Sequence, residues 1–394
     1  MKSLFTTHNT IHICMVTLLL LNVTISFNVF PFLQLFSYII WGLCCLNFLI
    51  MATVSLRKPI ISIFDTAIIF YLILLIIFTL INATDIKSAI YKTVEVLLLL
   101  MIINYRYDLK LIIKTCAIVL SCCTYLNLLI MLMFPDWMFV AKDVFDSYLL
   151  GGNYNQIGCR LICAIIMNLL CLKFSKKWII NTILVFIVSI ATLALVGSMT
   201  SLSGIILFSV FCLIPSHKLQ KATLIIFVLF IILFQITIVF NGEGLHNNPY
   251  AVYIIEDVLQ KDITFTNRTS LWDSAGKIFI ESPIIGYGFV NNDWYISNMN
   301  SFAIGPHNFI YSILINGGVV LFTIFTIICI LSLQKILSSY DKIATILLMG
   351  ISTLFFMATM EVYPFIFIFM LLFFTYNYPT LNSQLKIEKK IKSQ

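Results

Sequence analysis

One arginine occupies a position suited to binding a phosphate. Arg268 directly follows Asn267, at the predicted beginning of a helix over 267–281. Free backbone amides, the positive end of the helix dipole and a forked cation would converge there, and that combination suits a phosphate or pyrophosphate. An ordinary surface arginine would have the same spacing. The sequence therefore offers two interpretations of Arg268, a phosphate ligand or a surface cation.

A histidine marks the point where a long polar segment gives way to an apolar one. His307 follows Gly305-Pro306, and Asn308 and Tyr311 follow it on a predicted helix that soon meets Gly317-Gly318. A histidine can take or give a proton near neutral pH. This position indicates either a general base or a capping histidine at the membrane interface.

A second arginine lies inside an apolar run. The polar segment 151–156, which includes Asn155, leads into this run, and Arg160 lies one turn inside it. Intramembrane arginines are costly and usually face a cavity or a partner. Arg160 therefore either faces a polar outer cavity or extends to lipid headgroups. Lys92 and Glu95, three positions apart in another apolar run, are expected to form a structural ion pair.

Metal, redox and nucleotide chemistry have no support in the sequence. His8 and His12 have the spacing of two metal ligands but no third ligand. All eleven cysteines lie in or beside apolar runs, where they are expected to be small buried side chains without disulfides. The chain carries no Walker loop or dinucleotide fingerprint. No cofactor and no metal site are therefore expected.

The elements that must position these residues are membrane-spanning helices. The 394 residues are 61% hydrophobic and only 10% charged, against about 25% charged residues in soluble domains. A bilayer core about 30 Å thick needs roughly 20 apolar residues per helix. We predict an all-α integral membrane protein with about twelve spans, at 11–29, 32–54, 63–82, 88–104, 111–134, 157–172, 178–196, 200–214, 222–240, 308–333, 343–360 and 363–378.

The positive charges predict the orientation of these spans. Seventeen of the 24 basic residues fall in segments at every second turn of the chain and at its two ends, which is the positive-inside pattern. Both termini are therefore expected in the cytoplasm. We predict one polytopic domain over 1–378, with an outer loop at 241–306 before the last three spans, and a basic cytoplasmic tail at 379–394. The net charge of +7 reflects this pattern and does not indicate nucleic-acid binding.

The outer loop is expected to contain a short amphipathic helix over 267–281. Asn267 is a suitable N-cap, and Ser282-Pro283 would end the helix. Apolar residues recur at helical spacing between them, namely Leu271, Trp272, Ala275, Ile278 and Phe279. Such a helix would lie flat against the outer mouth of the bundle.

Three segments resemble the bacterial O-antigen ligase and O-antigen polymerase superfamily. They are Asn267–Trp272, Glu281–Gly288, and Pro306–Ile310 with Gly317-Gly318. The region of Asn155 and the turn at Gly197-Ser198 are similar more loosely. The topology, with about twelve spans and a large outer loop before the last three, is also similar to that superfamily.

The resemblance implies a metal-independent glycosyltransferase with a class C-like fold. Its donor would be a glycan on undecaprenyl pyrophosphate, and transfer would occur on the outer face of the bacterial plasma membrane. By position, Arg268 would hold the pyrophosphate and His307 would act on the acceptor hydroxyl. The superfamily often has an arginine where this chain has Met199, and Arg160 is a candidate replacement. Further expected substrate-binding residues are Asn155, Asn308, Trp272 and Tyr287.

Polymerisation of oligosaccharide repeat units is the leading function that the resemblance implies. A ligase that moves the glycan to a lipid A core shares the donor and the motifs, so it stays an alternative. A chain-length regulator and a flippase are the expected partners of a polymerase. A transporter of lipid-linked glycan is the alternative of another class, but it needs binding sites near the midplane and often shows repeats. This chain shows no repeat and concentrates its polar residues outside.

Overall fold

The computed structural model is built from helices. It describes residues 2–26, 34–57, 61–104, 108–134, 148–151, 154–214, 216–258, 262–265, 267–299, 305–337, 339 and 341–384. The predicted tail beyond residue 384, residues 135–147, and Gly152 and Asn153 lie outside the described residues.

Each of the twelve predicted spans contains a helix in the described part of the chain. These helices are α1 (Lys2–Thr24), α2 (Gln34–Arg57), α3 (Ile63–Ile81), α4 (Ile86–Asn104), α5 (Leu109–Met133), α6 (Tyr154–Phe174), α7 (Ile179–Val196), α8 (Met199–Leu213), α9 (His217–Phe234), α13 (Phe309–Leu337), α14 (Lys342–Ala358) and α15 (Phe365–Tyr376). The 3₁₀ turn η3 (Lys176–Trp178) adjoins α7, and the π-helical segment η4 (Gln235–Val239) adjoins α9. The predicted outer loop contains η5 (Gly242–Asn247), α10 (Pro249–Val252), η6 (Tyr253–Val258), α11 (Arg268–Glu281) and α12 (Asn292–Asn298).

Seven of the described helices are long and apolar enough to cross a membrane. They lie in α2, α3, α5, α6, α7, α9 with η4, and α13, and α15 with the following helix Tyr378–Gln384 makes an eighth if this pair, bent by 57°, counts as one span. Three shorter apolar helices lie at Ile13–Thr24, Met199–Leu213 and Lys342–Ala358. The chain is thus a multi-pass membrane protein in its composition and helix lengths, while the number twelve stays a prediction.

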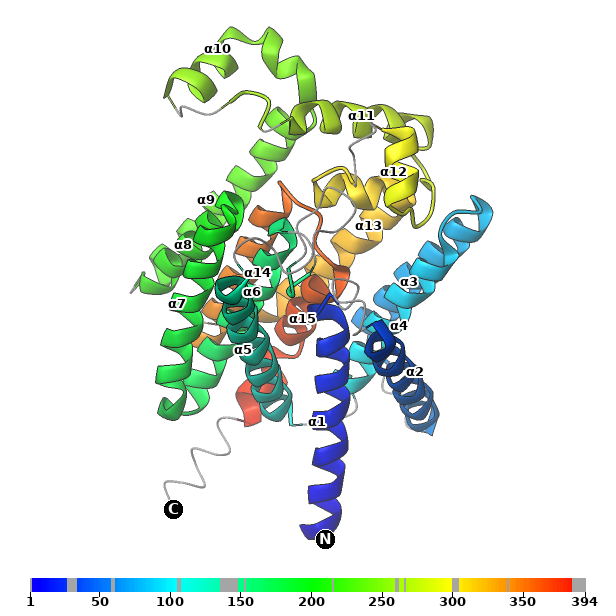
Figure 1. Cartoon of the computed structure of the whole chain (residues 1–394), viewed down its shortest axis with the longest axis vertical. Coiled ribbons are helices and arrows are strands. Elements are labelled where there is room, and N and C mark those ends of the chain that lie inside the picture. Colours follow the sequence, from blue (N-terminus) through cyan, green and yellow to red (C-terminus); the bar gives the residue numbers. More distant parts are fainter. Residues whose placement is uncertain are drawn as a thin grey trace.

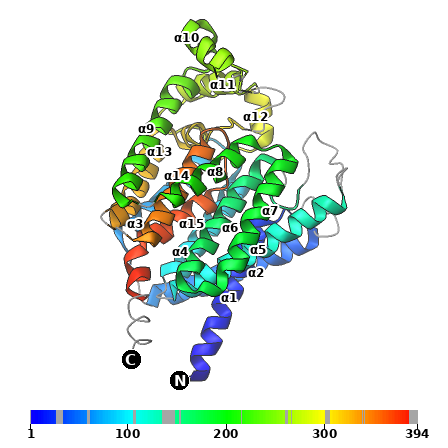
Figure 2. The ribbon, with the colours of Figure 1, turned by 90° about the vertical axis from the view of Figure 1, so that its left-hand side faces the viewer.

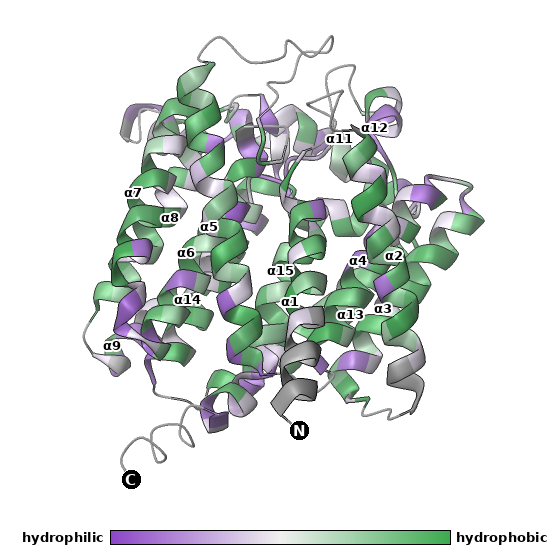
Figure 3. Cartoon of the chain, turned by 60° about the horizontal axis from the view of Figure 1, so that its bottom comes forward, coloured by the Kyte–Doolittle hydropathy of each residue, from purple (hydrophilic) through white to green (hydrophobic). Residues whose placement is uncertain are grey.

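The spanning helices lie side by side, and the loop helices gather at one end. Figures 1 and 2 place α10, α11 and α12 at this end and the beginning of α1 at the opposite end. Figure 3 shows the helices mostly green, with purple hydrophilic segments concentrated toward their ends. Large apolar side chains stay exposed on the outward faces of α2, α7 and α9, among them Leu49, Ile187 and Leu229. In a bilayer these faces would contact lipid.

Two helices form the middle of the bundle. From Phe365 to Thr375, every residue of α15 is buried, and α6 is buried over almost its whole length. A helix that is apolar on all sides is stable only where other helices or lipid surround it. The apolar sequence of α15 therefore fits its place between α4, α6, α13 and α14, which it contacts.

Helix α11 confirms the predicted amphipathic helix and corrects its predicted cap. It lies across the end of the bundle (Figure 1), where Trp272 and Ala275 are buried against Tyr311 of α13. Asn267 has left-handed backbone angles (φ 64°, ψ 17°), and its side chain makes no capping hydrogen bond. Capping residues usually have extended backbone angles, which aim the side chain at the first-turn amides. The predicted side-chain cap was therefore wrong, although the helix begins and ends at the predicted residues.

Reporter fusions would test the predicted orientation. We expect fusions after Lys177 and Lys221 to report a cytoplasmic position, and a fusion after Asn248 to report the outer side. The reason is that α7 and α8 form a hairpin about Gly197, so that, if both helices span the membrane as predicted, the chain returns to the same side between the two lysines. A pair of alkaline phosphatase and green fluorescent protein fusions at each site gives the readout. Opposite sides for Lys177 and Lys221 would show that the hairpin is wrong.

Candidate active site

A buried glutamate joins the two residues that the sequence singled out. Glu361 lies in the turn between α14 and α15, and its side chain is only 4% exposed. Its Oε1 accepts a hydrogen bond from Arg268 Nη2, and its Oε2 lies 3.0 Å from His307 Nδ1. Arg268 and His307 are partly open, at 15% and 20% exposed. The structure thus brings the arginine and the histidine together on one carboxylate.

This arrangement fixes which nitrogen of the histidine can act as a base. An ionised carboxylate only accepts hydrogen bonds, so Nδ1 of His307 must carry the proton that it shares with Glu361. In the neutral ring, Nε2 then keeps its lone pair. The same relationship orients the histidine of a Ser-His-Asp triad. The geometry therefore leaves Nε2 able to accept a proton from a hydroxyl.

Arg268 reaches Glu361 because α11 is anchored by its apolar face. Trp272 is fully buried, and Phe265 packs against it with ring centroids 5.9 Å apart. The backbone amide of Thr269 donates to Thr264, which holds the segment before the helix. Since Asn267 does not cap α11, its side chain does not cover the amides of the first turn. Arg268 thus lies at a helix N-terminus, where an anion is favoured.

His307 is positioned by its neighbour Asn308. The Asn308 side chain is fully buried; its Oδ1 accepts from Tyr311 N (2.9 Å), and its Nδ2 donates to Gln235 Oε1 and Thr359 O (2.8 Å each). The side-chain amide of Asn308 therefore caps α13 and connects it by hydrogen bonds to the ends of α9 and α14. These bonds show Asn308 supporting His307, and its direct contact with substrate stays a prediction.

The segment that ends at Gly288, after α11, and the pair Gly317-Gly318 inside α13 form one structural unit. Tyr287 N donates to Ile315 O (2.8 Å), and Val319 N donates to Pro283 O (2.8 Å). Gly318 has φ 59°, and a Cβ there would come within 2.2 Å of Ile284 O. Glycine is required because it alone accepts that angle and that approach of two backbones. The segment after α11 is thereby joined to the kink of α13 by main-chain bonds.

The same segment is also joined to the end of α3. Phe289 N donates to Thr79 Oγ1 (2.8 Å), and Asp85 N donates to Phe289 O (3.0 Å). Thr84 Oγ1 donates to Tyr287 O (2.8 Å). The segment 282–289 is therefore held between α3 and α13, and it fixes the C-terminal end of α11.

The other predicted substrate residues lie outside the Arg268–Glu361–His307 cluster. The hydroxyl of Tyr287 lies 3.2 Å from both Ile278 O and Glu281 Oε2, and burial followed by the Glu281 contact raises the pKa of Tyr287. Asn155 is buried on α6, and Trp272 is buried beneath α11. Their predicted contacts with substrate stay predictions.

Arg160 lines a separate cavity. Its guanidinium donates to the backbone oxygens of Val23, Thr24 and Gln156. Met199, at the position where the superfamily often has an arginine, is exposed. Replacement of that arginine by Arg160 stays a prediction.

Sequence reasoning assigned Glu361 only to a turn and missed its place in the site. The available signal was a lone acid in the long apolar stretch 343–378, where a charge usually has a partner. No group of three His, Cys, Asp or Glu side chains suited to a metal ion occurs among the described residues.

Comparison with known proteins gives one family. The O-antigen ligase family matches residues 182–326, from α7 into α13, a region that contains Arg268, His307 and both glycine-containing segments but not Glu361. No curated protein matches the chain, and no solved structure does. The family match confirms the resemblance of this chain to the O-antigen ligase and O-antigen polymerase superfamily.

Proposed function

We propose that this protein joins undecaprenyl-pyrophosphate-linked oligosaccharide repeat units into a longer glycan on the outer face of the bacterial plasma membrane. The observation that carries this proposal is the bridging of Arg268 and His307 by Glu361. This bridging supports the proposal, because it would set a cation for the leaving group beside an oriented base for the acceptor.

The proposed reaction uses each member of the cluster once. His307 Nε2 takes the proton of the acceptor hydroxyl while that oxygen forms a bond to the anomeric carbon of the donor. The bond between this carbon and the pyrophosphate oxygen breaks, and the pyrophosphate leaves with the electron pair. Arg268 and the amides of α11 stabilise the negative charge on the leaving group. Glu361 stabilises the imidazolium that His307 becomes.

The ligase alternative uses the same donor and the same residues. It differs only in the acceptor, which would be a lipid A core or another finished acceptor. The family match supports both activities equally. No observation favours the transporter alternative, because Arg268 begins α11, which lies at one end of the bundle (Figures 1 and 2).

Reconstitution would test the proposal directly. Vesicles containing the purified protein receive a synthetic lipid-linked repeat unit, and gel electrophoresis resolves the products. We expect a ladder of products that differ by one repeat unit. A single transfer product that forms only when a lipid A acceptor is added would show a ligase. Movement of donor across the bilayer with no new glycosidic bond would show a transporter.

A further inference from the structure

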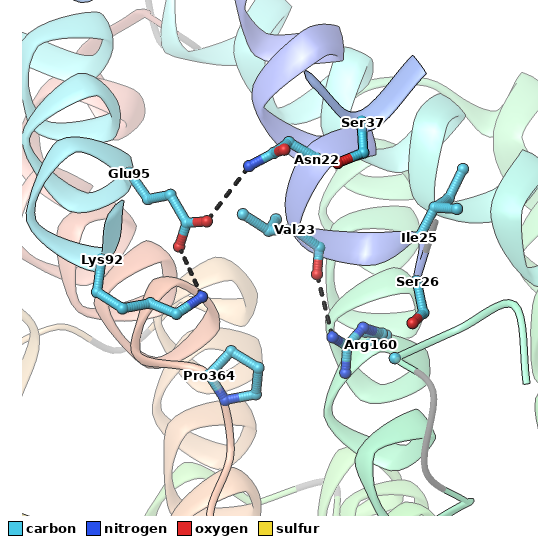
Figure 4. A pocket seen from close by; sticks show the side chains of 10 residues that line it. Asn22, Val23, Ile25, Ser26, Ser37, Lys92, Glu95, Arg160 and Pro364 are labelled. Atoms are coloured by element: carbon cyan, nitrogen blue, oxygen red, sulfur yellow. Dashed lines mark hydrogen bonds and ion pairs between the residues drawn. The ribbon is translucent and has the colours of Figure 1, made fainter. Parts of the chain in front are cut away.

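A polar cavity of about 230 Å³ lies apart from the Arg268–Glu361–His307 cluster. It is lined by residues at the ends of α1, α2, α6 and α15 and by residues of α4 (Figure 4). Its lining includes two cations, one carboxylate and several small polar groups. The ones that bear on its chemistry are Asn22, Ser26, Ser37, Lys92, Glu95 and Arg160.

The charges of this cavity do not cancel. Lys92 Nζ lies 3.2 Å from Glu95 Oε2, and Asn22 Nδ2 donates to the other oxygen of Glu95 (3.3 Å), so the predicted ion pair is confirmed and internally neutral. Arg160 is only 6% exposed, and within the described residues its guanidinium bonds to neutral backbone oxygens and the Cys159 thiol and lies 5.2 Å from the ring centroid of Phe367. The cavity therefore keeps one positive charge without a carboxylate partner.

The guanidinium of Arg160 is held rigidly. It donates to Val23 O (3.1 Å), Thr24 O (3.2 Å) and Gln156 O (2.7 Å). It also lies so close to Gly151 that a Cβ there would come within 2.4 Å of Nη1. These contacts exclude the alternative in which Arg160 extends to lipid headgroups. A buried charge of this kind is costly unless an anion compensates it.

The cavity and the cluster share one turn of the chain. Glu361 begins the turn and holds Arg268 and His307, whereas Pro364 ends the turn and lines the cavity. Three residues of chain reach about 11 Å at most. Gln156 Nε2 donates to Val362 O (2.6 Å), and the backbone oxygen of Gln156 accepts from Arg160. Two anions bound in the cavity and at Arg268 would thus be close neighbours.

We propose that this cavity binds the pyrophosphate of a second lipid-linked substrate, the acceptor. This inference rests on the proposed function, because polymerisation of lipid-linked units brings together two molecules that each carry a lipid pyrophosphate. Arg268 meets the pyrophosphate of the donor, and the cavity around Arg160 meets that of the acceptor. A cavity of about 150 Å³ accommodates a benzene molecule, so a volume of about 230 Å³ suits a phosphate group.

Substitutions at the two members of the ion pair should change pyrophosphate binding in opposite directions. This difference separates an electrostatic role of the pair from a structural one. Lys92→Gln lowers the cavity charge by one and should weaken pyrophosphate binding, on the order of tenfold. Glu95→Gln raises the charge by one and should strengthen binding by a similar factor. Lys87→Gln, on the same helix but exposed and outside the cavity, is the matched control and should bind like the unaltered chain. Arg160→Gln should abolish binding, with thermal unfolding checked in parallel.

Binding is measured by calorimetry on the full chain carrying both Arg268→Ala and His307→Ala, so that no transfer occurs and the pyrophosphate site proposed at Arg268 is removed. The probes are inorganic pyrophosphate and nanodiscs of phosphatidylcholine that contain either polyprenyl pyrophosphate or phosphatidylglycerol. Opposite effects of Lys92→Gln and Glu95→Gln on polyprenyl pyrophosphate and on inorganic pyrophosphate support the proposal. Charge-dependent binding of phosphatidylglycerol alone would assign the cavity to ordinary lipid and overturn it, as would equal binding by all variants. Since this readout needs no glycan transfer, its failure is distinct from failure of the polymerase assay.

Discussion

Replacement of Arg268 by alanine should abolish polymer formation while the protein still accumulates in the membrane. One lost donor to a developing negative charge typically lowers a rate about 10²–10³-fold. Here the change also removes the cation bound to Glu361, a carboxylate that is 4% exposed. Polymer is measured by gel electrophoresis of cell-surface glycan, and protein level by immunoblot of the membrane fraction.

Two further variants decide what Arg268 contributes. Arg268→Lys should also form little polymer, because the ammonium group of lysine is a point charge and cannot bind Glu361 and pyrophosphate together as the planar guanidinium can. Lys277→Ala, on the exposed face of the same helix, removes only a surface pair with Asp273 and should leave polymer normal. Normal polymer from Arg268→Ala would reduce this residue to a surface cation.

Replacement of His307 by alanine should lower the transfer rate at least about 10²–10⁴-fold, the usual contribution of a general base. Lipid-linked donor should then accumulate without being polymerised, as measured by thin-layer chromatography of extracted lipids. His307→Gln keeps a hydrogen-bonding group but not the basicity. If glutamine restores most activity, His307 only positions the acceptor. His246→Ala, on the exposed part of the outer loop, is the matched control.

Glu361 provides an internal check on this role. If it acts by orienting His307, then Glu361→Gln should slow transfer strongly alone but cost little more in a His307→Ala background, since residues in one unit are not additive. If the rate loss of the double variant equals the product of the two single losses, Glu361 works independently of His307.

The helices were largely predictable because their signals are local. Apolar runs gave the positions of the spanning helices, and helical spacing between Asn267 and Pro283 gave α11 nearly to the residue. The cap at Asn267 was not predictable in the same way. Its left-handed angles accompany bonds to Thr264 and the burial of Trp272, which belong to the tertiary structure of the loop.

Only those residues of the candidate site that lie in recognisable sequence motifs were predictable. Arg268 and His307 stand in segments that resemble the superfamily, whereas Glu361 lies 93 and 54 positions from them and in no such segment. A contact between residues so far apart depends on how α11, α13 and α14 pack. Periodicity records which face of a helix is buried but not which partner it meets, so the carboxylate that joins the site had to come from the structure.

The main-chain bonds of the segment 282–289 also decide where the outer loop can change length. In terms of chain entropy, a connection between α9 and α13 that is fixed at its middle behaves as two shorter loops. Extra residues at the exposed junction of η5 and α10, Asn247-Asn248, would add mainly loop-closure entropy, about 0.6 kcal/mol for each doubling of loop length. One extra residue between Ser282 and Gly288 would instead shift the register of bonds to α3 and α13 together. Length variation is therefore compatible with the exposed junction of η5 and α10 and incompatible with the segment that follows α11.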